Sequence, residues 1–223
     1  MSNLVFGAGA PSVAHTIDQS LRINQADDGY LSRTPSSNGD RKIYTVSCWV
    51  KVSDLGTLRT FFSSGPSPHS SNADWMIKFN SDDELLVGEW TGAGWTWYFQ
   101  TSAVYRDPGS WYHIVVAVDT NQSTESDRVN LYVNGDKITA FVTETYPAED
   151  WEGYLNSTAY KNYVGVHPGL TQDYDGYVAE MYLIDGTAYD ADDFGKTNSS
   201  TNQWIPKDAS GLTFGTNGFY QKY

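Results

Sequence analysis

Aromatic residues bracket a glycine-rich turn in the segment EWTGAGWTWYFQ, and this segment is the strongest candidate ligand site in the sequence. Trp90, Trp95 and Trp97 flank the glycines, and strand alternation would place Trp95, Trp97 and Phe99 on one face. Flat aromatic rings suit the apolar faces of sugar rings, with polar neighbours fixing the orientation. The same rings could instead fill the core of a sandwich or cover its convex surface, and this alternative stays open. Trp75 in SSNADWMIKF is a weaker candidate of the same kind.

Carboxylates arranged for glycoside cleavage are not apparent. Retaining glycosidases need two carboxylates that flank the scissile bond, one as nucleophile and one as acid. No E-x-D-x-x-E or E-x-D-x-E pattern occurs; Glu180 and Asp185 are five residues apart, hence on opposite faces of a strand, and Glu89 stands alone. We therefore expect no catalytic residues and no enzymatic activity.

Calcium is the candidate cofactor, because acidic residues gather in two turns. The segment TQDYDGY places Asp173 and Asp175 beside a glycine, and NSDDE offers Asp82 and Asp83. Calcium takes six to eight oxygen ligands, usually from loops. Solvated acids in a turn explain both segments equally well, so we name Asp173 and Asp175 as metal candidates with that alternative open. The four histidines show no zinc spacing.

The charge and the single cysteine restrict the classes of partner. A net charge of −13 argues against sequence-independent binding of nucleic acid and against adsorption to anionic membranes. Cys48 is the single cysteine, which excludes an intrachain disulfide, and its strand-like surroundings predict that its thiol is buried. We therefore expect the protein to be synthesised in a reducing compartment such as a cytoplasm. With no signal-peptide pattern and no long apolar run, we expect no membrane insertion.

Alternation of period two dominates the chain, and helical periodicity is scarce. Strand-like runs recur every 8 to 15 residues or so, separated by Gly, Pro, Ser, Asn and Asp, as in a sandwich or barrel. Asn134-Gly135 predicts a type I′ hairpin turn. A short acidic helical turn is expected around Ala191 to Phe194. The glycine-rich N-terminus is either disordered or an arm that orders against another subunit.

Four segments together resemble the laminin-G-like, pentraxin-like domains of the concanavalin A-like superfamily. They are QSLRINQADDGYLSRTPSS, YTVSCWVKV, SWYHIVVAVD followed by VNLYVNGDKI, and GYVAEMYLIDGTAYDADDFG, and the match covers about residues 19 to 195. SLRINQADDGYLSRTPSSNGDRK and GLTFGTNGFY resemble such domains in the fibre and decoration proteins of tailed-phage virions. The resemblance implies an all-β, two-sheet antiparallel jelly-roll sandwich with carbohydrate or protein binding, and calcium in some members.

The resemblance also implies an organisation and a function. Residues 1–18 would be an attachment arm or disordered, residues 19–195 the sandwich, and residues 196–223 a C-terminal extension packed on it. The expected function is a non-enzymatic structural protein of a tailed-phage virion, in a capsid decoration or tail fibre, that is made in the host cytoplasm and displays a domain for host-surface polysaccharide. Its partners would be other virion proteins, contacted through the arm, and further copies in a homo-oligomer, with a trimer fitting a fibre. The alternative is a free, calcium-dependent, carbohydrate-binding lectin.

Overall fold

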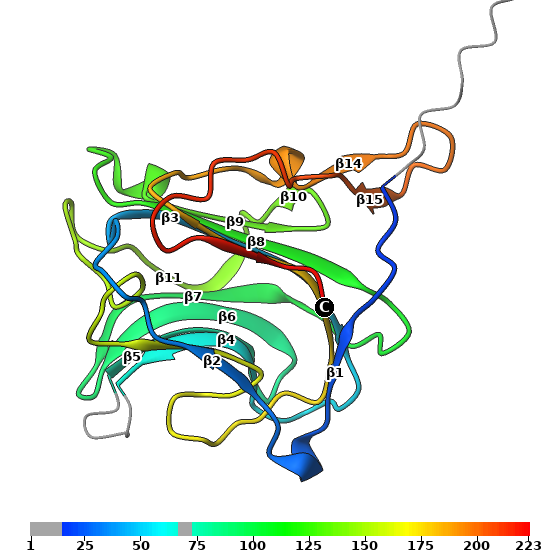
Figure 1. Ribbon diagram of the computed structural model, residues 1–223, viewed down its shortest axis with the longest axis horizontal. Coiled ribbons are helices and arrows are strands. Elements are labelled where there is room, and N and C mark those ends of the chain that lie inside the picture. Colours follow the sequence, from blue (N-terminus) through cyan, green and yellow to red (C-terminus); the bar gives the residue numbers. More distant parts are fainter. Residues whose placement is uncertain (1–14, 67–72) are drawn as a thin grey trace, which may run out of the picture.

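Two antiparallel sheets packed face to face form the protein (Figure 1). The computed structural model describes residues 15–66 and 73–223, and within these ranges each main sheet has seven strands. The all-β jelly-roll sandwich expected from the sequence is confirmed. No helix among the described residues is long and apolar enough to cross a membrane.

The first sheet is built around two ten-residue strands that are hydrogen-bonded to each other. Its order is β1 (Leu21–Ile23), β13 (Gly176–Asp185), β3 (Ile43–Val52), β8 (Tyr112–Asp119), β9 (Val129–Val133) and β10 (Asp136–Lys137), with β16 (Phe219–Gln221) also paired to β13. Positive φ angles at Asn134 (52°) and Gly135 (87°) turn the chain between β9 and β10, as the Asn-Gly pair predicts.

The second sheet carries the aromatic segment on neighbouring strands. Its order is β11 (Phe141–Thr145), β7 (Trp95–Val104), β6 (Glu84–Thr91), β5 (Ala73–Phe79), β4 (Arg59–Gly65), β12 (Lys161–Val164) and β2 (Leu31–Arg33). A two-stranded sheet joins β14 (Gly195–Thr197) to β15 (Trp204–Pro206), and the 3₁₀ turns are η1 (Gln25–Asp27), η2 (Glu125–Asp127) and η3 (Ala191–Asp193). Turn η3 confirms the acidic turn expected there, and the Asp190 side chain caps it.

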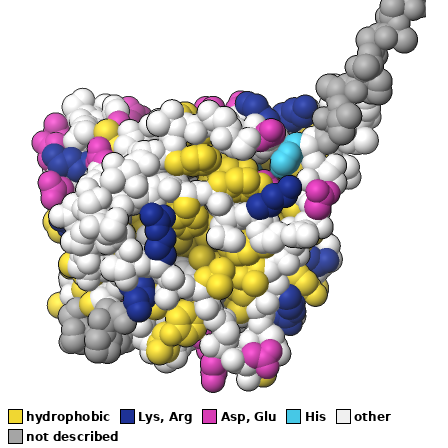
Figure 2. Space-filling view, in the orientation of Figure 1, with side chains coloured by type: hydrophobic (Ala, Val, Ile, Leu, Met, Phe, Trp, Pro, Cys, Tyr) yellow, Lys and Arg dark blue, Asp and Glu magenta, His cyan; other side chains and the backbone are white. Residues whose placement is uncertain are grey.

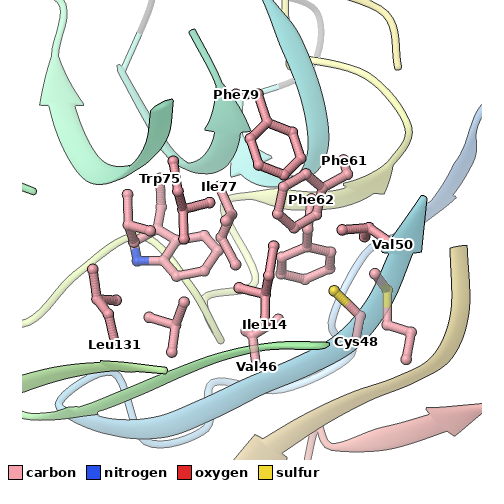
Figure 3. Packing of buried hydrophobic residues seen from close by; sticks show 14 of the residues in the cluster. Val46, Cys48, Val50, Phe61, Phe62, Trp75, Ile77, Phe79, Ile114 and Leu131 are labelled. Atoms are coloured by element: carbon pink, nitrogen blue, oxygen red, sulfur yellow. The ribbon is translucent and has the colours of Figure 1, made fainter. Parts of the chain in front are cut away.

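The hydrophobic core fills the space between the two sheets (Figure 3). Alternate residues of β3 point into it from one side, and Trp75 and Ile77 of β5 point into it from the other. Cys48 lies among them, fully buried, and burial raises the pKa of its thiol. The cysteine is therefore a packing residue and its thiolate is disfavoured.

The C-terminal segment is tied to the sandwich through one buried carboxylate. Asp185, at the end of β13, accepts hydrogen bonds from the backbone nitrogens of Asp40 at 2.7 Å and Asn217 at 2.9 Å. Strand β16 then pairs with β13. Residues 1–14 of the expected arm lie outside the described residues, and the domain boundaries stay predictions.

Candidate functional site

A β-bulge in β7 sends Trp95 and Trp97 to opposite faces of the second sheet. Trp97 pairs with Glu89 and Trp95 pairs with Trp90, so the two residue steps from Trp95 to Trp97 match a single step on β6. Such a bulge changes the alternation of side chains. The prediction that Trp95, Trp97 and Phe99 share a face is therefore wrong for Trp95, which lies on the outer face.

Trp95 forms an exposed aromatic platform on that outer face. Its ring stacks on Tyr98, with centroids 4.4 Å apart, and meets the Trp90 ring edge-on at 5.3 Å. A Cβ atom at Gly88 would lie only 2.9 Å from Cζ3 of Trp95, so the absent side chain leaves room for the indole. The ring is 37% exposed although two aromatic neighbours hold it, and it is thus oriented before any ligand arrives.

Strand β5 supplies the floor beside this platform. Because Trp75 and Ile77 face the core, alternation directs Asp74, Met76 and Lys78 to the outer face. Lys78 is 7% exposed, and burial lowers the pKa of its amino group. Its Nζ donates a 3.0 Å hydrogen bond to Oε1 of Gln172.

A histidine from the loop between β12 and β13 contacts the same floor. His167 Nε2 lies 2.6 Å from Oδ2 of Asp74, and its Nδ1 accepts a hydrogen bond from the backbone nitrogen of Gly169 at 3.1 Å. The Gly169 contact assigns the imidazole proton to Nε2, which donates to the carboxylate. Oδ1 of Asp74 is buried and has no hydrogen-bond partner among the described residues.

Together these side chains line a groove of about 640 Å³. Two indoles form one wall, and the floor and opposite wall carry Asp74, Lys78, His167, Thr171 and Gln172. Apolar surface with a few convergent polar groups is the usual composition of a ligand site, and hydroxyl-rich ligands need both donors and acceptors. Among the described residues that line the groove, Asp74 is the only carboxylate, so these residues do not supply the pair that glycoside cleavage requires.

Two of the four predicted tryptophans are core residues. Trp75 is 0% exposed and Trp97 is 1% exposed, and both belong to the cluster between the sheets. They do not line the groove, because they point to the opposite face of the sheet from Trp90 and Trp95. The structure thus brings together Trp90 and Trp95 alone of the predicted set.

The predicted calcium residues are not arranged as a metal site. Asp175 forms an ion pair with Arg22, its Oδ1 lying 2.7 Å from Nη2. The pKa of Asp173 is raised mainly by burial and to a lesser extent by the negative charge of Asp28. Across the described ranges, no three His, Cys, Asp or Glu side chains come together as metal ligands. Asp173 and Asp175 therefore belong to no cluster of metal-ligating side chains within the described residues.

The sequence analysis did not predict Asp74, Lys78 and His167 as groove residues, and the reasons differ. Asp74 and Lys78 could have been found, since alternation in ADWMIKF places them opposite Trp75 and Ile77. His167 could not, because it stands in a loop whose path over the outer face follows from no local pattern.

Solved structures with this fold have low sequence identity to the chain. A CBM40 domain of the Ruminococcus gnavus IT-sialidase, bound to α2,3-sialyllactose, aligns with a TM-score of 0.56 and 11% identity over 78% of this chain and 93% of that one. Domain 4 of the arabinanase AbnA from Geobacillus stearothermophilus, in complex with arabinotriose, aligns with a TM-score of 0.53 and 18% identity over 79% of this chain and 75% of that one.

Domains LG4-5 of the mouse laminin α1 chain align with a TM-score of 0.53 and 12% identity over 95% of this chain and 49% of theirs, so the chain spans about half of that structure. At these identities the likeness establishes the fold. No sequence among the curated proteins matches this chain. The Laminin_G_3 family model, of the concanavalin A-like lectin/glucanases superfamily, matches residues 25–192. This match covers well over half of the sequence, and the chain belongs to that family.

Proposed function

We propose that the protein is a non-enzymatic glycan-binding module that uses the groove of Trp90 and Trp95. The exposed, pre-oriented Trp95 ring beside a polar floor is the observation that carries the proposal. An indole face stacks on the apolar face of a sugar ring, while polar side chains of the lining such as Lys78, Thr171 and Gln172 form hydrogen bonds with its hydroxyls. Two similar domains were solved with oligosaccharides, which supports a sugar as the ligand.

The proposed ligand is a polysaccharide of a bacterial surface, and the proposed setting is a tailed-phage virion. Two terminal segments support this setting by their resemblance to virion modules. These segments also contact each other, since Arg33 Nη1 donates to the Asn217 carbonyl at 2.8 Å and Asn217 Nδ2 donates to the Ser37 carbonyl at 3.0 Å. In this proposal the protein is made in the host cytoplasm, residues 1–18 attach it to other virion proteins, and it forms a homo-oligomer such as a trimer.

The test has two parts with separate readouts. Labelled protein is titrated onto a panel of bacterial surface polysaccharides, and saturable binding to at least one is expected, without release of reducing sugar. A variant that lacks residues 1–14 should keep this binding and lose assembly onto phage particles. Failure of all polysaccharides to bind contradicts the glycan proposal, and assembly of the shortened variant contradicts the attachment role of the arm.

A further inference from the structure

A second cavity lies at the open edge of the sandwich, between the edge strands β2 and β16. It has a volume of about 320 Å³, comparable to small-ligand sites. The described residues that line it are all different from those that line the groove of Trp95. Figure 2 shows hydrophobic side chains gathered on this face, where β2 and β16 lie in Figure 1. The cavity is lined by Leu31, Ser32, Arg33, Phe62, Asn162, Val164, Phe219 and Gln221.

Asn162 brings an unsatisfied carboxamide to this cavity. Val164, two residues along β12, belongs to the core, so alternation also directs Asn162 inward between the sheets. The residue is 3% exposed, and neither its Oδ1 nor its Nδ2 has a hydrogen-bond partner within residues 15–66 and 73–223. A buried polar group without partners is costly, and such groups call for an explanation.

The chemistry of the carboxamide restricts what could satisfy it. It presents a donor and an acceptor side by side, so its complement presents an acceptor and a donor at similar spacing. The walls formed by Leu31, Val164 and Phe219 are apolar, so the complement also needs an apolar group next to that pair.

We propose that this cavity binds the acetamido group of an N-acetylated amino sugar. The acyl carbonyl accepts from Asn162 Nδ2, the hydroxyl on the adjacent ring carbon donates to Oδ1, and the acyl methyl packs on Val164 and Phe219. Polar residues at the rim, Ser32, Arg33 and Gln221, face the remaining hydroxyls. The choice of a sugar as the carrier rests on the proposed function, whereas the preference for the acyl group rests on Asn162 alone.

The direct test uses the unaltered protein and a pair of probes that differ at the acetamido position. N-acetyl-D-glucosamine and D-glucose are titrated separately while the side-chain amide resonances of Asn162 are followed by NMR. A saturable shift with N-acetyl-D-glucosamine and none with D-glucose is expected. Equal shifts with both sugars, or no shift with either up to tens of millimolar, would overturn the proposal.

Two variants distinguish sugar binding in this cavity from sugar binding in the groove. Asn162→Leu removes the donor and the acceptor, so binding of N-acetyl-D-glucosamine should weaken by about tenfold or more while the fold persists, because an apolar side chain suits a buried position. Trp95→Ala should leave the Asn162 shift unchanged. If polysaccharides fail to bind but the Asn162 shift is seen, the groove proposal fails alone. If Asn162→Leu binds the sugar as well as the unaltered protein does, the cavity proposal fails alone.

Discussion

Glu89 carries its carboxyl group into the interior of the sandwich, on the opposite face of β6 from the groove. The residue is 0% exposed, and burial raises its pKa from 4.5 to about 7. Hydrogen bonds from the Tyr154 backbone nitrogen at 2.9 Å and from Trp151 Nε1 at 2.7 Å oppose this rise in part. A carboxyl group that titrates near neutrality links the stability of the fold to pH.

The sign of this linkage follows from the raised pKa. Between about pH 4.5 and 7 the folded chain holds a proton that the unfolded chain has released, so the free energy of unfolding falls as pH rises through this window. The full shift corresponds to about 3 kcal/mol. We expect Glu89→Gln to show a flatter pH dependence than the unaltered protein in urea unfolding at about pH 5 and about pH 8. The exposed Glu125→Gln is the matched control, and an unchanged pH slope in Glu89→Gln would contradict the assignment.

A substitution at Gly88 tests whether the orientation of the Trp95 ring affects polysaccharide binding. A Cβ at this position would lie 2.8 Å from the Trp97 carbonyl oxygen and 2.9 Å from Trp95 Cζ3, so Gly88→Ala must displace the backbone or the indole. We expect polysaccharide affinity to fall about tenfold and the free energy of unfolding to fall by about 1–3 kcal/mol. Gly94 lies in the same hairpin, and a Cβ there meets nothing within 4 Å, so Gly94→Ala should change neither quantity. Equal affinities of the two variants would contradict the role of the platform.

Among the elements, β7 marks the limit of what the sequence could predict. Alternation correctly indicated the strands, and the Asn134-Gly135 turn followed from the conformations these residues tolerate. The bulge between Trp95 and Trp97 depends on pairing with β6, and no local pattern encodes it. Hence the aromatic segment could be identified from the sequence, but which of its rings face outward could not. The proximity of His167, which is distant in sequence, could not be predicted either.

A further prediction concerns the carboxylate of Asp185, the last residue of β13. Asp185 is 6% exposed and accepts hydrogen bonds from two backbone N–H groups, one at Asp40 between β2 and β3 and one at Asn217 before β16. In Asp185→Asn an NH2 group replaces one carboxylate oxygen and would point a donor at the N–H group of Asp40 or Asn217. We therefore expect a loss of about 2–3 kcal/mol in the free energy of unfolding. Asp136→Asn, at an exposed position of β10, is the control. A loss no larger than that of the control would show that the carboxylate does not hold these segments.

At the scale of the whole molecule, the acidic residues are dispersed and form no carboxylate cluster among the described residues. The net charge is −13, but Asp175 pairs with Arg22 and no three metal-ligating side chains meet in the described ranges. We expect calcium and a chelator to leave both Tm and polysaccharide binding unchanged. A rise in Tm of several degrees with calcium, or binding abolished by the chelator, would favour the calcium-dependent lectin instead.

The proposed function depends on the groove being the glycan-binding surface. Its most direct test compares the affinity of the unaltered protein and of Trp95→Ala for whichever polysaccharide of the panel binds saturably. Tyr30→Ala is the matched control, because Tyr30 is a 42% exposed aromatic residue outside the groove. We expect a loss of about tenfold or more in affinity for Trp95→Ala and no change for Tyr30→Ala, since the substitution removes the apolar surface on which the sugar ring packs. Equal affinities of the three proteins would contradict it.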